Sequence, residues 1–485
     1  MSDAPDLLGA RRAKLDRLRA EGTDPFPHAF PGVETTSAVR AAHAGLEAGA
    51  QNEARHRVAG RLAARRGQGG MAFLDIADRS GRLQVQARAD VLGPEAHERL
   101  LSLDLGDLVG IDGTAFVTRR GELSLRVDAF TLLAKSLRPP PDKHHGLQDT
   151  ETRLRRRELD LLANEDTREL FLARAKVIAA VRRALDDDGF VEVETPVLQP
   201  LYGGALARPF TTEFNALDQK MYLRIATELY LKRCLVGGLE RVYELGKDFR
   251  NEGLSPKHNP EFTMCEWYEA YADYEDAAAR TERLVYTAAR AVLSETQAQH
   301  FAPPWKRETL AGAIGLRTGI DILEHRERES LGAAIGQHGT AQVPVEGRTW
   351  AQLVDDLLST FVEPTLDEPT FLLDYPVELS PFAKRHRATD GLVERWEAFV
   401  NGMEIANAFS ELNDPDEQRA RFEAQVRHAQ AGDEEAQPYD EAFVQALEHG
   451  MPPTGGVGLG MDRLVMALTG RRSIRDVVLF PALRE

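Results

Sequence analysis

The chain has 485 residues, of which 42% are hydrophobic and 28% are charged, and its formal net charge is −17 at pH 7. This composition excludes disordered and fibrous proteins, and two cysteines are too few for a disulfide framework or a structural zinc site. The negative charge argues against indiscriminate binding of polyanions. Because no uncharged apolar run approaches the ~20 residues that cross a bilayer, we expect a soluble, cytoplasmic protein with no membrane partner.

The first third of the chain is rich in short alternating segments. Residues 6–20 carry leucines among charged residues at helical spacing and predict an amphipathic helix. Between about residues 56 and 134, alternating hydrophobic and polar residues predict five strands, with a helix at 94–103 between the third and fourth. Five short strands and one helix are typical of an oligonucleotide-binding barrel, and the same pattern also fits a barrel that serves only for packing.

A Pro-rich segment, LRPPPDKHHG at 137–146, separates this region from a region with a different pattern of secondary structure. Helices are predicted beyond it at 151–163 and 166–188, followed by mixed strands and helices. We therefore place a domain boundary here. The first domain covers residues 1–145 and the second covers residues 146–485.

Two alternating segments, at 243–253 and 260–271, predict antiparallel strands joined by a long loop. By strand parity one face carries Arg250 from the first segment and Phe262, Met264, Glu266 and Tyr268 from the second. An arginine beside a flat ring suits a phosphate ester attached to a purine. An ordinary surface hairpin has the same pattern, so this segment alone leaves the choice open.

A second hairpin is predicted within residues 394–414, because Asn401-Gly402 is a strong signal for a two-residue turn. With that turn, Phe399 opposes Glu404, and Glu397 and Glu404 lie diagonally on one face. Carboxylate oxygens suit Mg²⁺ when substrate phosphates complete its coordination shell. The pair therefore predicts a magnesium site.

The residues that follow Glu404 have a parity problem. Asn407, Phe409 and Glu411 are two residues apart, so they share one face of a strand, but by the same spacing Glu404 lies on the opposite face. Either a β-bulge near residues 406 and 407 returns them to the same face, or the two sets point apart.

A Gly-rich strand that enters a helix is predicted at 455–470, with Asp462-Arg463 at the junction. The segment GGVGLGMDRLVMALTG lacks the GK[ST] of a phosphate-binding loop and the spacing of a dinucleotide-binding turn. We interpret the glycines as positions where another group approaches the backbone closely.

In this order and spacing, the segments resemble the three motifs of class II aminoacyl-tRNA synthetases, and most closely the lysyl-tRNA synthetase family. The resemblance spans nearly the whole chain and rests on VAGRLAARRG, LRPPPDKHHGL, DFRNEGLSPKHNPEFTMCEWYEAYADY, ANAFSELNDP and GVGLGMDRLVMALTG. It places the three motifs at about 171–198, 242–271 and 455–470, and a helical insertion at about 305–365.

The resemblance implies an α+β fold, in which an N-terminal oligonucleotide-binding (OB-fold) β-barrel precedes a class II synthetase antiparallel sheet of six to seven strands flanked by helices. It also implies a homodimer that binds ATP, L-lysine, tRNA(Lys) and Mg²⁺. Such an enzyme joins lysine to ATP as lysyl-adenylate, releases pyrophosphate, and passes lysine to the 3′ end of the tRNA. The lysine carboxylate is itself the nucleophile, so the protein has to align the reacting groups and neutralise charge.

Roles of individual residues follow from the resemblance, position by position. The catalytic residues are Arg250 and Arg463. The ATP-binding residues are Arg250, Glu252, His258, Asn259, Phe262, Glu397 and Arg463, with Phe262 and Arg463 on the two faces of adenine. The lysine-binding residues are Gly204, Glu228, Glu266, Tyr268, Asn407, Phe409 and Glu411, with Glu411 at the ε-amino group. The Mg²⁺ ligands are Glu397 and Glu404, and the anticodon-binding residues are Phe73, Gln84 and Glu122.

The chain departs from the family pattern at Thr227, where a proline is usual, and at Trp267, where leucine is commoner. Both positions lie beside ligand positions, so they concern the geometry of the pocket more than the reaction.

Three other functions share parts of this pattern. A paralogue that lysylates a translation factor lacks the barrel predicted here. A class II synthetase for aspartate or asparagine needs cationic groups for its substrate, which Phe409 and Glu411 do not supply. A non-catalytic RNA-binding protein with a decayed synthetase domain is expected to have lost charged residues such as Arg250 and Glu404.

Overall fold

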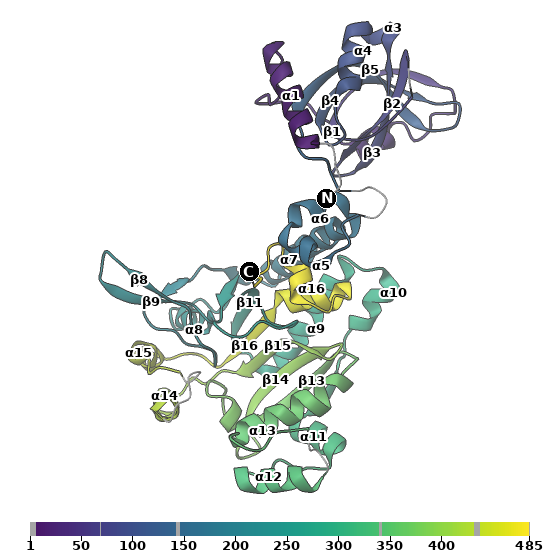
Figure 1. The fold of residues 1–485 in the computed structure, drawn as a ribbon. Coiled ribbons are helices and arrows are strands. Elements are labelled where there is room, and N and C mark those ends of the chain that lie inside the picture. Colours follow the sequence, from purple (N-terminus) through teal and green to yellow (C-terminus); the bar gives the residue numbers. More distant parts are fainter. Residues whose placement is uncertain (1–5, 68, 142–145, 339–341, 431–436, 485) are drawn as a thin grey trace. The chain divides into compact units, whose positions relative to one another are not determined.

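The computed structural model describes residues 6–67, 69–141, 146–338, 342–430 and 437–484 (Figure 1). The chain divides into two compact units, of which the first is Met1–Gln148 with Glu158–Ala163 and the second is Asp149–Arg157 with Asn164–Glu485. The last residues of the predicted first domain, 142–145, lie outside the described residues. Within the described ranges, no helix combines the length and apolarity needed to cross a membrane.

The N-terminal unit contains a closed barrel of five strands in the order β1-β2-β3-β5-β4 (Figure 1). Its elements are α1 (Leu7–Ala20), α2 (Thr36–Ala42), β1 (Gln51–Arg66), β2 (Met71–Asp78), β3 (Gly81–Arg88), α3 (Ala89–Leu92), α4 (Pro94–Ser102), β4 (Leu108–Val117) and β5 (Leu123–Ala134). Every second side chain of β2 and β3 enters the core, including Leu74, Ile76, Leu83 and Val85. The predicted helices at 6–20 and 94–103 and the five-stranded barrel are confirmed.

The second unit is built on an eight-stranded sheet in the order β12-β13-β14-β15-β16-β11-β10-β6. The strands are β6 (Val191–Glu192), β10 (Arg241–Phe249), β11 (Glu261–Ala270), β12 (Lys306–Thr309), β13 (Thr370–Pro376), β14 (Leu392–Val400), β15 (Met403–Ser410) and β16 (Thr454–Gly460). The six central strands are antiparallel, whereas β6 and β12 pair in parallel at the two edges. The expectation of six to seven antiparallel strands is therefore wrong at the edges. Parallel pairing needs a crossover connection, and helices lie in both connecting segments.

Helices and a small three-stranded sheet surround this sheet. The helices are α5 (Thr150–Arg155), α7 (Glu165–Asp187), α8 (Glu228–Val236), α9 (Tyr274–Arg290), α10 (Glu295–Ala298), α11 (Leu310–Thr318), α12 (Arg328–Gln337), α13 (Trp350–Leu357), α14 (Pro415–Gln430), α15 (Glu441–Glu448), α16 (Met461–Thr469) and α17 (Ile474–Val477). Helix α6 (Arg157–Ala163) belongs, from Glu158 onward, to the first unit. The small sheet contains β7 (Leu198–Gln199), β8 (Thr211–Phe214) and β9 (Gln219–Leu223). The single helix predicted at 151–163 is wrong, because Arg156 leaves the helical conformation (φ −121°, ψ 56°) and separates α5 from α6.

One face of the large sheet packs against α7, α9 and α16. Cys265 and Trp267 of β11 share this core with Val177 of α7, Leu284 of α9 and Val465 of α16. Since neighbouring residues of a strand point to opposite faces, Glu266 and Tyr268 are directed to the other side of the sheet. The polar residues of the second predicted motif, Glu266 and Tyr268, therefore lie together on the face opposite this core.

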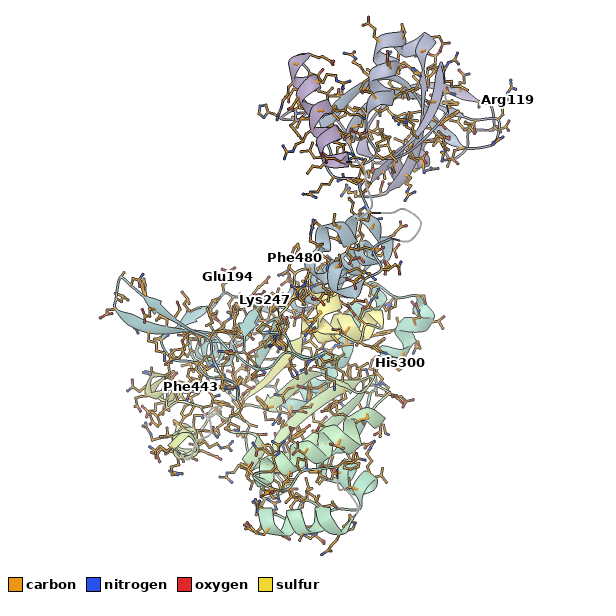
Figure 2. All side chains as sticks on the ribbon, in the orientation of Figure 1. Arg119, Glu194, Lys247, His300, Phe443 and Phe480 are labelled. Carbon is orange, nitrogen blue, oxygen red and sulfur yellow. The ribbon has the colours of Figure 1, made fainter. Side chains whose placement is uncertain are left out.

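A separate aromatic cluster supports that other side. Phe443 of α15 is fully buried and packs against Phe422 of α14, with 6.3 Å between ring centroids (Figure 2). Phe382 and Tyr268 belong to the same cluster. The cluster thus holds the wall against which Tyr268 lies.

Candidate active site

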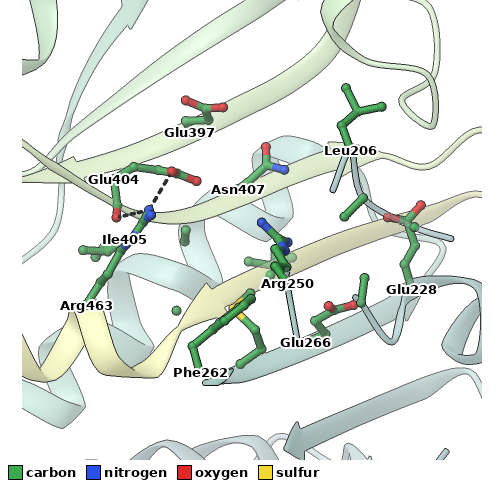
Figure 3. A pocket seen from close by; sticks show the side chains of 18 of the residues that line it. Leu206, Glu228, Arg250, Phe262, Glu266, Glu397, Glu404, Ile405, Asn407 and Arg463 are labelled. Carbon is green, nitrogen blue, oxygen red and sulfur yellow. Dashed lines mark hydrogen bonds and ion pairs between the residues drawn. The ribbon is translucent and has the colours of Figure 1, made fainter. Parts of the chain in front are cut away.

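A cavity of about 370 Å³ opens on this side of the sheet (Figure 3). Its walls come from β11, β15, β16, the 250–260 loop and the start of α16. The cavity contains every residue expected to bind ATP, lysine or Mg²⁺, namely Gly204, Glu228, Arg250, Glu252, His258, Asn259, Phe262, Glu266, Tyr268, Glu397, Glu404, Asn407, Phe409, Glu411 and Arg463. Their individual roles stay predictions.

Strands β10 and β11 pair antiparallel, as the sequence predicts. Asp248 lies opposite Phe262, and Glu244 lies opposite Glu266. Arg250 follows the last residue of β10, and its backbone N–H donates to the carbonyl of Pro260 at 2.9 Å. This bond holds the Arg250 guanidinium at 5.1 Å from the centroid of the Phe262 ring, so the expected arginine and aromatic ring meet.

A β-bulge in β15 resolves the parity problem. Phe399 pairs with Glu404 as predicted, but Ala398 pairs with Ala406, so Ile405 is an extra residue. The bulge lies one residue before the predicted position. The alternative in which the two sets point apart is wrong, because one cavity contains Glu404, Asn407, Phe409 and Glu411.

The glycines of β16 let side chains from neighbouring strands approach the backbone. Gly456 pairs with Tyr268 on one side and with Phe409 on the other. A Cβ atom at Gly456 would collide with the Glu411 carboxylate and the Tyr268 ring. The interpretation of this segment as a site of close approach is confirmed for Gly456.

Glutamates dominate the closed end of the cavity. Glu411 is 1% exposed, and its Oε1 has no hydrogen-bond partner among the described residues. Burial raises the pKa of Glu411 to about 8, and nearby Glu228 adds to the rise. Burial also raises the pKa of Glu266 to about 8, helped by Asp248 and Glu228. Such carboxylates gain free energy from a bound cation, because the cation replaces the water they have lost.

Sequence reasoning missed Lys232, which lies behind these carboxylates. Its Nζ is 2.6 Å from Glu228 Oε1 and 2.5 Å from Glu411 Oε2. Glu228 and Lys232 are four residues apart, a spacing that brings side chains together on a helix and could have revealed the first pair. The second pair joins α8 to the residue after β15 and has no local signal.

Thr227 gives the departure from the family pattern a structural consequence. Its backbone N–H donates to Glu266 Oε1 at 3.3 Å, a bond that a proline at this position cannot make. The Tyr268 hydroxyl donates to the other oxygen, Oε2, at 3.3 Å. Both oxygens of Glu266 are therefore held in place.

At the other end of the cavity, Arg463 lies beside Glu404 (Figure 3). His258 lies next to the same arginine. Its Nη1 donates to Glu404 Oε2 at 2.8 Å, and Nη2 lies 3.3 Å from His258 Nε2. Arginine only donates, so His258 Nε2 accepts, and Nδ1–H donates to Ser255 Oγ at 2.7 Å. Burial and the nearby Arg463 lower the pKa of His258, which keeps it neutral at neutral pH.

Glu397 and Glu404 lie on the same side of the cavity (Figure 3). Burial raises the pKa of Glu397 to about 7, against the opposing effect of Arg395, whose Nη2 lies 2.5 Å from Glu397 Oε1. Arg395 was also missed, although its alternation with Glu397 on one strand was visible. Within the described ranges, no three His, Cys, Asp or Glu side chains gather as a metal site. Two carboxylates fit Mg²⁺ where phosphate and water oxygens complete six-fold coordination.

Asn259 carries a second unpartnered acceptor in the cavity. It is buried, and its Nδ2 donates to the carbonyl of Glu261 at 2.6 Å. Its Oδ1 has no partner in the described part of the chain. A buried amide oxygen of this kind suits an N–H donor of a ligand.

Phe73, Gln84 and Glu122 lie in the N-terminal unit. Phe73 is half-buried on β2 between buried Ala72 and Leu74, so its ring is on the outer face of the barrel. The ring of Phe73 therefore lies outside the core of the barrel. Gln84 is on the neighbouring strand β3, and exposed Glu122 accepts a bond from Arg40 at 3.1 Å.

Comparison with known proteins agrees with this arrangement of barrel, sheet and cavity. The family model described as tRNA synthetases class II (D, K and N) matches residues 149–484, and the OB-fold nucleic acid binding domain matches residues 56–133. Such a barrel followed by such a sheet defines a class II tRNA synthetase.

Curated relatives cover almost the whole chain. The lysine–tRNA ligase of Chloroflexus aurantiacus is 51% identical over 99% of this chain and 98% of its own length. Those of Moorella thermoacetica and Bacillus subtilis are 49% and 46% identical over 99% of this chain, and over 98% and 97% of their own lengths. The chain belongs to the lysine–tRNA ligase family of class II tRNA synthetases.

The close approach at Gly456 generates a first prediction. In Gly456→Ala the added methyl displaces Glu411 or Tyr268, so we expect KM for the amino acid to rise about tenfold or more, which corresponds to ~1.4 kcal/mol of lost binding. Gly450→Ala, at a glycine with open space around it, is not a suitable control because its φ is +95°. Gly336→Ala in α12 is the control, since nothing lies within 4 Å and no positive φ is needed there. Equal KM values in both variants would contradict the close contact.

The raised pKa values generate a second prediction. Glu266 and Glu411 bind a cation in their ionised forms, and both have pKa values of about 8. Cation binding near pH 7 must therefore expel protons, so KM for the diamino substrate should fall as pH rises from 6.5 to 8.5, by up to about tenfold per unit for each proton displaced. KM for ATP, measured in the same pyrophosphate-exchange series, should change less. A flat profile for the amino acid would contradict the assignment.

Proposed function

We propose that the chain activates L-lysine with ATP, forming lysyl-adenylate and pyrophosphate, and then transfers lysine to the 3′ end of tRNA(Lys). The observation that carries this assignment is the buried Glu411 Oε1, unpartnered among the described residues, at the closed end of a cavity that Arg250 also lines. A zwitterionic diamino acid supplies a terminal ammonium group to Glu411 and a carboxylate to Arg250. Glu411 therefore receives the ε-amino group and Arg250 receives the carboxylate.

The first step is an in-line attack of the lysine carboxylate on the α-phosphorus of ATP. Arg250 binds both the carboxylate and the α-phosphate, which brings the reacting atoms together and offsets the charge that develops on phosphorus. Phe262 stacks on adenine, and Arg463 takes the second face of the base and neutralises phosphate charge. Asn259, His258 and Glu252 complete the ATP contacts from the loop.

The α-amino group of lysine binds between α8 and β11. Glu228 and Glu266 supply carboxylates, Gly204 leaves space beside them, and Asn407 lies on the neighbouring wall. Phe409 and Tyr268 flank the aliphatic stem of the substrate.

Mg²⁺ enters with ATP in this proposal. Glu397 and Glu404 would hold the ion, which would supply positive charge beside the phosphates of ATP. Arg395 fixes Glu397, and Arg463 fixes Glu404, so both carboxylates are oriented before ATP arrives.

Discrimination against other amino acids follows from the closed end of the cavity. A neutral side chain leaves the Glu411 oxygen buried without a partner, which costs about 1–3 kcal/mol or more for a charged group. Aspartate and asparagine fit worse, because a further acceptor would face Glu411. The translation-factor paralogue is disfavoured by the N-terminal barrel.

The proposal includes recognition of the tRNA anticodon by the barrel, in which Phe73 stacks on a base and Gln84 and Glu122 bond to base edges. It also includes a cytoplasmic homodimer. The dimer is supported by apolar side chains that are exposed in the first predicted motif, at Val191, Val197 and Leu198.

Amino-acid-dependent ATP–pyrophosphate exchange across the twenty standard amino acids tests the reaction and the substrate together. Lysine should support exchange at least 100-fold better than any neutral amino acid, on the order of 3 kcal/mol. Glu411→Gln should lose about 100-fold in kcat/KM for lysine while its affinity for ATP is retained. Glu441→Gln, which changes a surface glutamate of α15, is the matched control. Unchanged lysine activation in Glu411→Gln would remove this residue from the pocket.

The barrel carries a separate prediction. Phe73→Ala should lower kcat/KM for tRNA(Lys) about tenfold to 100-fold, because one base–aromatic stack contributes ~1–3 kcal/mol. Pyrophosphate exchange without tRNA should not change, and Val91→Ala, an exposed apolar residue of α3, should leave both assays unchanged. Equal losses in both assays would count against the barrel as the anticodon reader.

A further inference from the structure

Lys232 is a fully buried lysine of α8 that lies behind the cavity without lining it. Among the described residues, its Nζ forms ion pairs with the two carboxylates named above, Glu228 at 2.6 Å and Glu411 at 2.5 Å. The Phe382 ring lies 5.5 Å from its Nζ. The ammonium group therefore has no contact with solvent and acts only on the pocket.

The geometry divides each carboxylate between Lys232 and the cavity. Lys232 takes Oε1 of Glu228 and Oε2 of Glu411. The second oxygen of each remains for a ligand, and that of Glu411 lies directly above Gly456. Because one nitrogen contacts both residues, it also holds the two carboxylates at a fixed separation, although they come from α8 and from the end of β15.

The charges of this end of the cavity balance only when Lys232 is counted. Glu228, Glu266 and Glu411 bring three negative charges in their ionised forms, and the Tyr268 hydroxyl stays neutral because burial among them raises its pKa. Glu228 and Glu411 raise the pKa of Lys232, which keeps it protonated. The remaining charge is minus two. A diamino acid carries two ammonium groups, whereas its carboxylate is matched by Arg250 in the same cavity.

We propose that Lys232 is a positioning residue that sets the specificity for lysine. It cancels one of three buried carboxylate charges, and it aims the free oxygens of Glu228 and Glu411 at the two ammonium groups of the substrate. This inference rests on the proposed function, since it assumes a diamino acid in the cavity. Lys232 does not touch the substrate. It acts through the two glutamates that do.

The consequence is a pocket whose affinity depends on charge number. A substrate with one ammonium group leaves an uncancelled negative charge in a site without water, which is unfavourable. Loss of the Lys232 charge has the opposite effect, because three carboxylates then face two ammonium groups. One carboxylate would take up a proton and stop binding its ammonium group.

Lys232→Met tests this, since methionine keeps the length of the side chain and removes its charge. In lysine-dependent pyrophosphate exchange we expect KM for lysine to rise about tenfold or more, while KM for ATP stays within about twofold. The reason is that a carboxylate that loses its charge partner has its pKa raised by about one unit or more. The pH at which KM for lysine levels off should move upward by about one unit. Lys306→Met, which breaks an exposed lysine–glutamate pair on β12, is the matched control and should match the wild type.

A double variant separates charge balance from simple damage. Glu228→Gln/Lys232→Met again leaves two negative charges, at Glu266 and Glu411, and removes the buried pair as a unit. We expect its KM for lysine to be lower than that of Lys232→Met, with the pH limb returning toward the wild-type position. Glu228→Gln alone keeps the ammonium beside Glu411, so its pH limb should lie below that of the double variant.

These outcomes are decisive in each case. An unchanged KM for lysine and an unchanged pH limb in Lys232→Met overturn the proposal, and so do parallel losses for lysine and ATP, which indicate a merely structural role. If Lys232→Met does not fold, coincident pH limbs of Glu228→Gln and the double variant overturn it. A wild type that does not activate lysine at all would instead refute the proposed function.

Discussion

Burial of carboxylates in one cavity is the constraint on which the rest of this structure depends. Ionised glutamates lose hydration when they are buried, and the chain compensates with partners placed from several elements. Lys232 binds Glu228 and Glu411, Arg395 binds Glu397, and the Thr227 N–H binds Glu266. At the closed end, Glu411 Oε1 keeps an acceptor that has no hydrogen-bond partner among the described residues. The site is thus prepared for a cation before a substrate arrives.

The antiparallel sheet brings these groups together by alternation. One face of β11 adds Trp267 to the core under the helices, while the other presents Glu266 and Tyr268 to the cavity. Gly456 makes the arrangement possible, because any side chain there would occupy the space of Glu411 and Tyr268. Packing and chemistry are therefore linked, since a change in one strand moves the functional residues of its neighbours.

Division into two units separates two kinds of recognition. The barrel presents an aromatic ring and polar groups on its outer face, a combination suited to unstacked bases. The second unit contains the cavity, which carboxylates and arginines line. Because the barrel core and the sheet core contain different residues, substitutions on the barrel surface and in the cavity are expected to act independently.

The sequence by itself determined the features that depend on neighbouring residues. The Asn-Gly turn set the pairing of Phe399 with Glu404, and strand parity placed Phe262, Glu266 and Tyr268 on one face. The disagreement in parity between Glu404 and Glu411 was also visible in the sequence, but it left open whether a bulge corrects it or the two sets point apart.

The tertiary structure decided what depends on contacts between distant segments. The bulge at Ile405 follows from the pairing of β15 with both β14 and β16, and the parallel edge strands follow from their crossover helices. The pairing of Lys232 with Glu411 was likewise invisible in the sequence. Local rules describe spacing along one element, whereas a buried ion pair between α8 and the end of β15 exists only after the sheet has brought the two together.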